Sequence, residues 1–228
     1  KTVATYVNTH TDLSDELYRE GKLVSDNYKN ILRSQTNAAA IPAEVTVRYG
    51  VTVRRANLRN LPTGEGLFFY AGDRNFDALQ ETALDPGEAV AILHTSTNGY
   101  FYYVQAYNYR GWLSKFDVAE TDRSTWLRYA EPKNFLTVVA KDYTLKADGA
   151  QVLFQQGARL QLADKKASAY TVKVPVRTKE GKLQEEKVVL AANASLHEGY
   201  LPYTTNNIIR SAFKFYDSVY GWGGLQQS

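Results

Sequence analysis

The stretch Val45-Thr46-Val47-Arg48-Tyr49-Gly50-Val51-Thr52-Val53 decides the fold of the middle of the chain, because its apolar side chains recur at every second position. That period is typical of a half-buried β-strand. Further short segments of strand character follow, and Pro/Gly or Asn-Gly turns separate them. Short strands at such spacing predict a small barrel. The predicted strands are Asn57–Arg59, Ala89–Leu93, Tyr100–Ala106 and Gly111–Ser114, and the turns are Pro62-Thr63-Gly64, Asp85-Pro86-Gly87 and Asn98-Gly99.

A second set of strand-like segments follows Pro132. In the clearest of them, residues 170–176, tyrosine and valine side chains share one face, and threonine and lysine take the other. We therefore expect two consecutive barrels of similar size, although no clean sequence repeat links them. The predicted strands of the second barrel are Leu136–Ala140, Val152–Phe154, Arg159–Ala163, Tyr170–Val176 and Lys187–Ala191.

Both ends of the chain have a helical period instead. In residues 1–44, Leu13, Leu17 and Tyr18 lie one turn apart, with Ser14 and Asp15 available as caps. A second weak helical pattern covers Asn27–Arg33, and Ala38–Ala43 is expected to be a linker.

After Pro202 the helical period returns over Asn207–Tyr216, with Thr205 or Asn206 placed to cap the first turn. This helix needs a surface to pack on. Its apolar face consists of Ile208, Ile209, Ala212, Phe213 and Tyr216.

Composition limits the function classes. The net charge of +3 and pI of 8.8 suit an encounter with an anionic polymer but are too weak to argue for nucleic acid. With no cysteine, these residues hold no disulfide, thiolate metal site or cysteine nucleophile. The longest apolar runs are too short to span a membrane. The first residue is Lys1, as in a processed protein, and a removed signal peptide is expected.

The most specific motif lies near the C-terminus. Gly199-Tyr200-Leu201-Pro202-Tyr203-Thr204, the helical stretch and Tyr220-Gly221-Trp222-Gly223-Gly224 together resemble the start of the catalytic domain of NlpC-type, papain-like cell-wall peptidases. In that family the Tyr-x-Trp-Gly-Gly segment leads to an Asp-Cys-Ser, whose cysteine is the nucleophile. The sequence ends at Ser228, before such a cysteine, so we expect this chain to stop just short of it.

Two weaker motifs resemble bacterial SH3-like domains. Gly111-Trp112 resembles their Gly-Trp strand, and Asn57-Leu58-Arg59 followed by Pro62 resembles the Asn-x-Arg-x-x-Pro signature near their start. Trp112 is expected in the core of the first barrel in any case.

The resemblance implies a mainly β fold with α-helices, in four parts. These are an N-terminal helical stabilising segment (1–44), a first SH3-like barrel (45–130), a second SH3-like barrel (131–198) and the start of a papain-like α+β catalytic domain (199–228). The intact protein would be an exported periplasmic or cell-envelope cysteine endopeptidase that hydrolyses γ-D-glutamyl-L-diamino acid bonds in muropeptides. Its missing C-terminal catalytic domain would supply the thiolate, and this chain alone would be inactive.

The resemblance also implies substrate-binding residues. In related peptidases, a Glu and a Tyr of the SH3-like domain hold the free amine of the substrate's N-terminal L-alanine, and Glu81 and Tyr109 match them by local context. Both could sit on loops at one rim of the first barrel. Tyr220 would face the acidic residue of the substrate, with Trp222 in the same segment, and Gly223 and Gly224 would allow a close backbone approach.

Other kinds of site find little support. No catalytic residue, metal site or cofactor is expected in this chain. His10, His94 and His197 have no ligand or nucleophile partner at a recognisable spacing. The glycines at 221–224 follow a helix and have no Lys-Ser/Thr after them, which argues against a phosphate loop.

Two alternatives stay open, namely a non-catalytic peptidoglycan-binding protein of SH3-like modules and a nucleic-acid binder on small barrels. The scattered basic residues disfavour the second.

Overall fold

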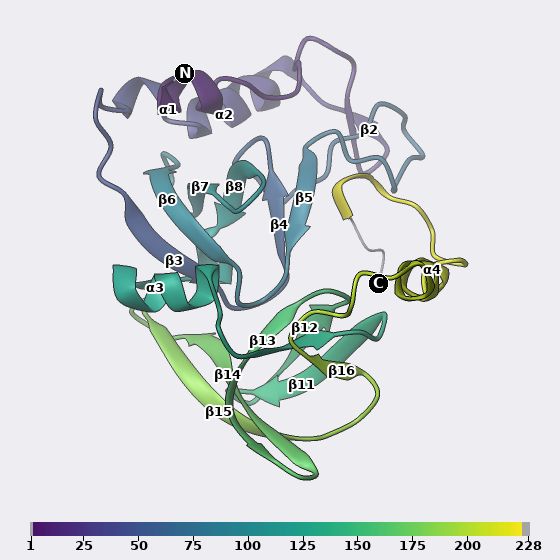
Figure 1. Ribbon diagram of the computed structural model, residues 1–228. Coiled ribbons are helices and arrows are strands. Elements are labelled where there is room, and N and C mark those ends of the chain that lie inside the picture. Colours follow the sequence, from purple (N-terminus) through teal and green to yellow (C-terminus); the bar gives the residue numbers. More distant parts are fainter. Residues whose placement is uncertain (1, 225–228) are drawn as a thin grey trace.

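The structure is a computed structural model that describes residues 2–224. A layer of short helices and loops covers one end of a seven-stranded sheet, and a second sheet system lies at the opposite end (Figure 1). The fold is mainly β with helices at both ends, as predicted. Leu225–Ser228, at the end of the motif-bearing segment, lie outside the described residues, and the predicted domain boundaries stay predictions.

The seven strands of the first sheet lie in the order β5-β4-β8-β7-β6-β3-β9. Leu84 of β5 and Val118 of β9, from its two edge strands, belong to one buried core, so the sheet is curled into a barrel, called here the first barrel. The strands are β3 (Arg48–Thr52), β4 (Ala56–Arg59), β5 (Gln80–Leu84), β6 (Ala89–Thr95), β7 (Phe101–Gln105), β8 (Arg110–Ser114) and β9 (Val118–Thr121), with the 3-10 turn η2 (Lys115–Asp117) before β9.

The Gly111-Trp112 motif holds β8 against β4 and packs on the N-terminal helix. A Cβ on Gly111 would lie 2.6 Å from the carbonyl oxygen of Arg59, so a glycine is needed where the two strands meet. Trp112 is fully buried, with Tyr103 at 5.2 Å between ring centroids, and Val7 of helix α1 (Val3–Val7) completes this cluster. The prediction that Trp112 is a core residue is confirmed.

The N-terminal segment differs from its prediction. Leu13 and Leu17 are buried, but they belong to an irregular stretch rather than to a helix. Tyr18 is in a strand, whose backbone exchanges hydrogen bonds with Phe68 (2.7 and 2.9 Å). These pairings compete with the local helical spacing, and the leucines pack on Leu61, Leu67 and Leu79 of the first barrel's long loop. The elements here are β1 (Tyr18–Arg19), β2 (Lys22–Leu23), α2 (Asp26–Gln35), which extends the predicted 27–33 helix, and the 3-10 turn η1 (Ala38–Ala40).

The second barrel consists of a five-stranded sheet, in the order β15-β14-β13-β10-β16, and the separate hairpin β11–β12. Phe154 of the hairpin is buried in the same core as Val172 and Val174 of β14, so the hairpin closes over the sheet. The strands are β10 (Phe135–Val138), β11 (Asp142–Ala147), β12 (Ala150–Gln155), β13 (Arg159–Lys166), β14 (Ala169–Arg177), β15 (Leu183–Ala191) and β16 (Leu196–Glu198).

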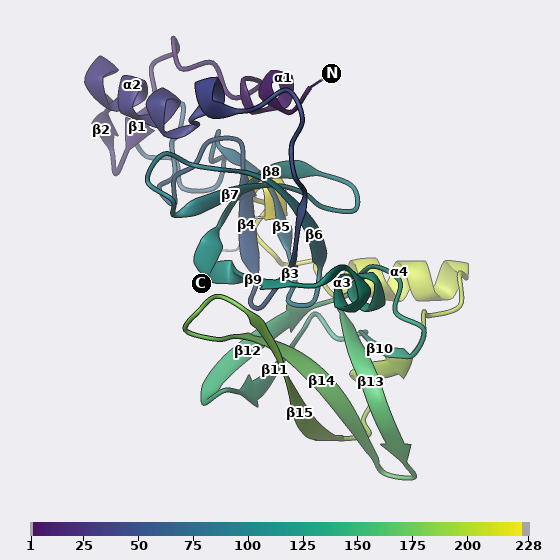
Figure 2. The same ribbon diagram turned by 90° about the vertical axis from the view of Figure 1, so that its left-hand side faces the viewer.

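The two barrels are joined by helix α3 (Arg123–Ala130), which we did not predict, and by direct contacts (Figure 2). Asp122 caps α3 by accepting a hydrogen bond from the Thr125 amide at 2.9 Å. The amide of Glu120 donates to the carbonyl of Gly181 (2.8 Å), and Arg177 Nε donates to the carbonyl of Val118 (3.0 Å). The barrels are therefore packed end to end.

The last elements of the described residues are helix α4 (Thr205–Phe213) and the short turn η3 (Trp222–Gly224). Thr204, one residue before the predicted caps, accepts the hydrogen bond from the Asn207 amide (3.3 Å). The apolar face of α4 is exposed, with 67% of Phe213 accessible to solvent. No helix among residues 2–224 is long and apolar enough to cross a membrane.

Candidate functional site

Glu81 lies at a β-bulge in β5, an edge strand of the first barrel. Thr82 pairs with Leu58 and Gln80 pairs with Arg59, so Glu81 is an extra residue between two registered pairs. A bulge bends the strand and re-aims the side chain that it carries. We expected Glu81 on a loop; it belongs to the strand, because β5 continues to Leu84 before the Asp85-Pro86-Gly87 turn.

The carboxylate of Glu81 is held by Asn60, from just after β4. Asn60 Nδ2 donates to Glu81 Oε1 at 3.0 Å, and it also lies 2.9 Å from Thr11 Oγ1 and 3.2 Å from the carbonyl of Ala78. Thr11 belongs to the N-terminal segment, so three separate parts of the chain meet at this amide. The Glu81 side chain is therefore fixed while remaining partly accessible.

Tyr109 lies beside Glu81, on the hairpin that joins β7 to β8. Its carbonyl accepts hydrogen bonds from the Ala106 amide (2.8 Å) and from Gln105 Nε2 (3.0 Å), which fix the turn. A hydrogen bond to the Glu81 carboxylate, together with the charge of that carboxylate, raises the pKa of Tyr109. The phenol is exposed and stays protonated at neutral pH, so it can donate to Glu81.

Two further residues, Tyr103 and Arg110, lie in the electrostatic environment of Glu81 and Tyr109. Burial raises the pKa of Tyr103 to about 12, and the negative charge of Glu81 adds to this effect while Arg110 opposes it. The guanidinium of Arg110 stacks on the ring of Tyr6 at 3.7 Å. Glu81 therefore has a neutral phenol and a neutral amide as its hydrogen-bond donors and can accept a further cationic donor.

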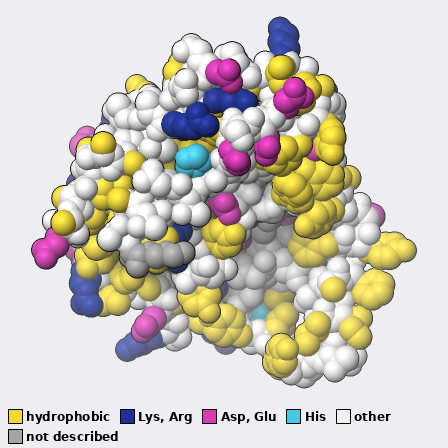
Figure 3. All heavy atoms as spheres, turned by 90° about the horizontal axis from the view of Figure 1, so that it is seen from above, with side chains coloured by type: hydrophobic (Ala, Val, Ile, Leu, Met, Phe, Trp, Pro, Cys, Tyr) yellow, Lys and Arg dark blue, Asp and Glu magenta, His cyan; other side chains and the backbone are white. Residues whose placement is uncertain are grey.

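Tyr220 and Trp222 pack on the long loop between β4 and β5. The Trp222 amide donates to the carbonyl of Asn75 at 2.9 Å, and its ring lies 5.4 Å from Phe76 and 6.4 Å from Phe69 between centroids. Tyr220 lies 6.3 Å from the same Phe76. Figure 3 shows hydrophobic side chains gathered toward the right-hand side of the molecule, where the C-terminal segment lies in Figure 1.

Gly223 lies against the backbone of β5. It has a positive φ of 58°, and a Cβ there would lie 2.6 Å from Gln80 Cγ and 2.9 Å from the backbone carbon of Glu81. Gln80 Nε2 donates to the Gly223 carbonyl (3.2 Å), and Arg55 donates to that of Gly224 (3.1 Å). A glycine is thus required for this approach.

A buried ion pair supports the strand and loop beneath this contact. Arg59 and Asp77 are 4% and 2% exposed and 2.8 Å apart. Arg59 also donates to Gln80 Oε1 (3.1 Å), and Asp77 Oδ1 accepts from the amides of Leu67 (3.1 Å) and Leu79 (3.0 Å). Removing one partner of such a buried pair costs about 3–5 kcal/mol.

The structure thus places the Tyr109 phenol close enough to the Glu81 carboxylate for the carboxylate to raise its pKa, and it places Tyr220 and Trp222 together on Phe76. The two pairs are linked through β5, because Gly223 follows Trp222 and touches the backbone of Glu81.

The sequence did not point to Asn60, Gln80 or Phe76, which hold these residues in place. Asn60 adjoins the Asn57-Leu58-Arg59 motif, and Arg59 of that motif is the buried partner of Gln80, so the motif was a partial signal. The sequence gives no signal that would identify Phe76.

Within residues 2–224, no group of three or more His, Cys, Asp or Glu side chains is placed to hold a metal ion. His10 and His197 lie within hydrogen-bond distance of backbone carbonyls, of Thr11 (2.8 Å) and Gly199 (3.3 Å). His94 does the same with Asn37 (3.1 Å), and burial lowers its pKa. Each imidazole has a structural backbone partner.

Comparison with known proteins supports the same fold. The family described as SH3 domain (SH3b1 type) matches residues 67–114. A solved structure described as a novel NlpC/P60 endopeptidase from Photobacterium damselae subsp. piscicida is similar with a TM-score of 0.74 and 21% sequence identity. That match covers 98% of this chain and 50% of that one, so this chain spans half its length. No curated protein sequence matches the chain. The fold of this chain is therefore similar to that of half of this NlpC/P60 endopeptidase, and residues 67–114 match an SH3 domain.

Proposed function

We propose that this chain is the substrate-recognising part of a bacterial cell-wall peptidase that hydrolyses γ-D-glutamyl-L-diamino acid bonds in muropeptides. In this proposal Glu81 and Tyr109 bind the free amine of the N-terminal L-alanine, and Tyr220 and Trp222 border the acidic residue that follows. The protein works outside the cytoplasm, in the periplasm or envelope, where this substrate is found.

The observation that carries the proposal is the Glu81–Tyr109 contact on the strand against which the C-terminal segment docks. The Glu81 carboxylate has Asn60 on one oxygen (3.0 Å) and the neutral Tyr109 phenol as its second donor. An ammonium group brings three donors and a positive charge, which match the remaining acceptor sites of the carboxylate. An amide-linked alanine nitrogen lacks that charge, so the pair discriminates between free and acylated stems.

The strength of this discrimination depends on enclosure. An exposed ion pair contributes about 0–1 kcal/mol. A charge-assisted hydrogen bond shielded from water contributes roughly 1.5–3 kcal/mol. We infer that a catalytic domain outside these 228 residues closes over Glu81 and supplies the thiolate, since the chain has no cysteine.

The exposed apolar face of α4 supports such a domain. Ile208, Ile209 and Phe213 are all exposed, although the helix is amphipathic and well capped by Thr204. A helix of this length is marginally stable without a packing surface. In the intact peptidase this face packs inside the catalytic domain.

The experiment is an NMR titration of the purified chain with L-alanyl-γ-D-glutamyl-L-lysine and its N-acetyl form. We expect the free peptide to shift the resonances of Glu81 and Tyr109, and the acetylated peptide to bind more weakly. Glu81→Gln should abolish the preference, and Glu44→Gln, at an exposed carboxylate elsewhere, should leave it unchanged. Equal binding of both peptides to the wild-type chain would contradict the amine-binding role.

A second candidate is a non-catalytic peptidoglycan-binding protein of SH3-like modules, and the match of residues 67–114 to an SH3 domain (SH3b1 type) favours it. The gene of the intact protein separates the two. An Asp-Cys-Ser codon run shortly after Ser228 supports the peptidase, and a serine, an alanine or a stop codon in its place supports the binding protein.

A further inference from the structure

A groove between the two barrels is lined by residues that the proposed peptidase site does not use. It has a volume of about 930 Å³ and is bounded by β6, the β7–β8 hairpin, helix α3 and the start of β13. Cavities of roughly 300–1,000 Å³ are the usual size for small-ligand sites. We call it the interbarrel groove; its lining includes Glu88, Tyr107, Trp126, Pro132, Arg159 and Tyr200.

Three aromatic side chains stand along this groove. Tyr107 on the hairpin is 93% exposed, and Tyr200, just after strand β16, is also exposed. Tyr200 is held in place, because its ring packs edge-on against Phe135 at 4.8 Å and its hydroxyl accepts from Arg159 at 3.4 Å. Trp126 is fixed in the same way, by a hydrogen bond from Nε1 to the Val90 carbonyl (3.0 Å).

The half-buried charges of the groove neutralise each other. Glu88 and Arg159 form an ion pair at 3.6 Å, and the exposed Glu131 and Lys133 add one charge of each sign. A charged ligand would have to separate the Glu88–Arg159 pair, whereas a neutral one can hydrogen-bond to it. The remaining wall includes four small apolar side chains, namely Ala89, Ala91, Ala106 and Ala130, together with Gln105 and Gly157.

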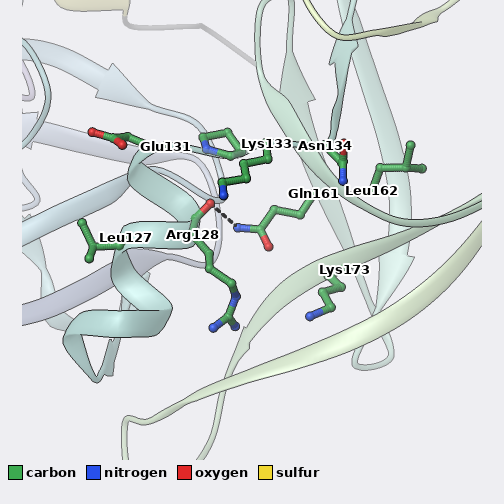
Figure 4. A pocket seen from close by; sticks show the side chains of 9 residues that line it. Leu127, Arg128, Glu131, Lys133, Asn134, Gln161, Leu162 and Lys173 are labelled. Carbon is green, nitrogen blue, oxygen red and sulfur yellow. Dashed lines mark hydrogen bonds between the residues drawn. The ribbon is translucent and has the colours of Figure 1, made fainter.

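A second cavity of about 480 Å³ adjoins the interbarrel groove and shares Glu131, Pro132 and Lys133 with it (Figure 4). Gln161 crosses this cavity to donate to the carbonyl of Arg128 at 3.1 Å. The cationic groups of Arg128 and Lys173 both pair with Glu185, at 3.3 and 2.9 Å. The two cations share one carboxylate, so this cavity is more positively charged than the interbarrel groove, and the uncharged ligand proposed below is assigned to the interbarrel groove alone.

We propose that the interbarrel groove binds an uncharged, N-acetylated oligosaccharide. Exposed aromatic faces match the C–H faces of sugar rings, since tyrosine and tryptophan are both apolar and hydrogen-bonding. The alanine wall has room for acetamido methyl groups, and the Glu88–Arg159 pair offers an acceptor and donors to hydroxyls. This site is separate from the Glu81–Tyr109 pair and does not depend on the proposed peptidase activity.

The hairpin supplies a matched pair of variants for the test, because Tyr107 lines the groove and Tyr109 contacts Glu81. The probe is tetra-N-acetylchitotetraose, titrated into the purified chain by NMR and calorimetry, with cellotetraose as the sugar that lacks acetamido groups. Tyr107→Ala and Tyr200→Ala should each weaken chitotetraose binding by roughly two- to tenfold, the effect of one aromatic contact. Tyr109→Phe and Glu81→Gln should leave it unchanged.

Tyr203→Ala is the control for surface exposure, because Tyr203 is 94% exposed and does not line the groove. The proposal predicts that this variant binds chitotetraose as the wild type does and that cellotetraose binds more weakly. It is overturned if chitotetraose does not bind or if Tyr203→Ala weakens binding as much as Tyr107→Ala. Shifts of groove resonances caused by the stem peptide instead of the sugar would also overturn it.

Discussion

Gln80 Nε2 donates a hydrogen bond to the carbonyl of Gly223 at 3.2 Å, across 143 positions of sequence. This contact covers part of the β5 edge of the first barrel, where unpaired backbone groups would otherwise be exposed. It also fixes the position of Trp222 relative to Glu81, because Gly223 touches the backbone of both Gln80 and Glu81. The C-terminal segment and the barrel therefore form one surface.

Gly223→Ala should release the C-terminal segment from β5. The new Cβ would lie 2.6 Å from Gln80 Cγ and 2.9 Å from the Gln80 carbonyl, on a backbone that already has a positive φ of 58°. We expect faster proteolysis within residues 214–224 and a change in Trp222 fluorescence, with the barrels still folded.

The control for that variant is Gly149→Ala. Gly149 also has a positive φ, of 73°, but no atom lies within 4 Å of its added Cβ. Backbone strain alone costs roughly 1–2 kcal/mol, so Gly149→Ala should lower the free energy of unfolding and leave the C-terminal segment docked. Equal release of the segment in both variants would show that general destabilisation, not the clash, causes it.

Breaking the Arg59–Asp77 pair should lower the free energy of unfolding, and a second substitution should restore part of that loss. Arg59→Met leaves the buried Asp77 charge unpaired, so the free energy of unfolding should fall by about 3–5 kcal/mol. Adding Asp77→Asn removes that charge, and its Oδ1 can still accept from the amides of Leu67 and Leu79. Urea unfolding should show the double variant to be more stable than Arg59→Met; a further loss would contradict the ion-pair explanation.

Tyr103 should make the first barrel sensitive to alkali. Burial raises the pKa of Tyr103 from the ordinary tyrosine value of 10.0 to about 12, so the folded state retains the phenol proton more strongly than the unfolded state. The associated stability is complete below pH 10 and is lost as pH rises toward 12, by on the order of 2 kcal/mol. In Tyr103→Phe, unfolding free energies measured across this range should fall less steeply than in the wild type.

Helix α4 should be the least protected helix of the chain against hydrogen exchange. None of its residues is buried, so its amides are expected to open locally at small free-energy cost. Phe213→Ser should change the unfolding free energy by less than about 0.5 kcal/mol. Protection of α4 equal to that of the barrel strands would indicate a packing partner, such as a second copy of the chain.

Local pattern predicted those parts of the fold in which each strand has one buried face. Strand β14 shows this, because Val172 and Val174 are buried as their alternation requires. Pattern failed at Leu13 and Leu17, whose helical spacing is overridden by packing on the long loop of the first barrel. It also missed β5, β9, β11 and β16, which are short or carry charged residues among the apolar ones.

The sequence predicted individual residues of the candidate site, but not the contacts that bring them together. Local context placed Tyr109 before the Gly-Trp strand, but the bulge at Glu81 depends on strand pairing with β4. The Asn60 amide and the Gln80–Gly223 contact join positions that are 21 and 143 residues apart. Such contacts arise from the tertiary fold, and no local period encodes them.

The measurement that tests the central claim most directly is kcat/KM of the proposed intact peptidase on stems with a free and an acetylated L-alanine. Glu81→Gln should lower kcat/KM for the free stem by about one to two orders of magnitude, from roughly 1.5–3 kcal/mol of lost charge-assisted hydrogen bonding. It should change the value for the acetylated stem far less, and Tyr109→Phe should have a smaller effect in the same direction. Unchanged kcat/KM for the free stem in both variants, with folding intact, would show that the first barrel is a scaffold and that the amine is recognised elsewhere.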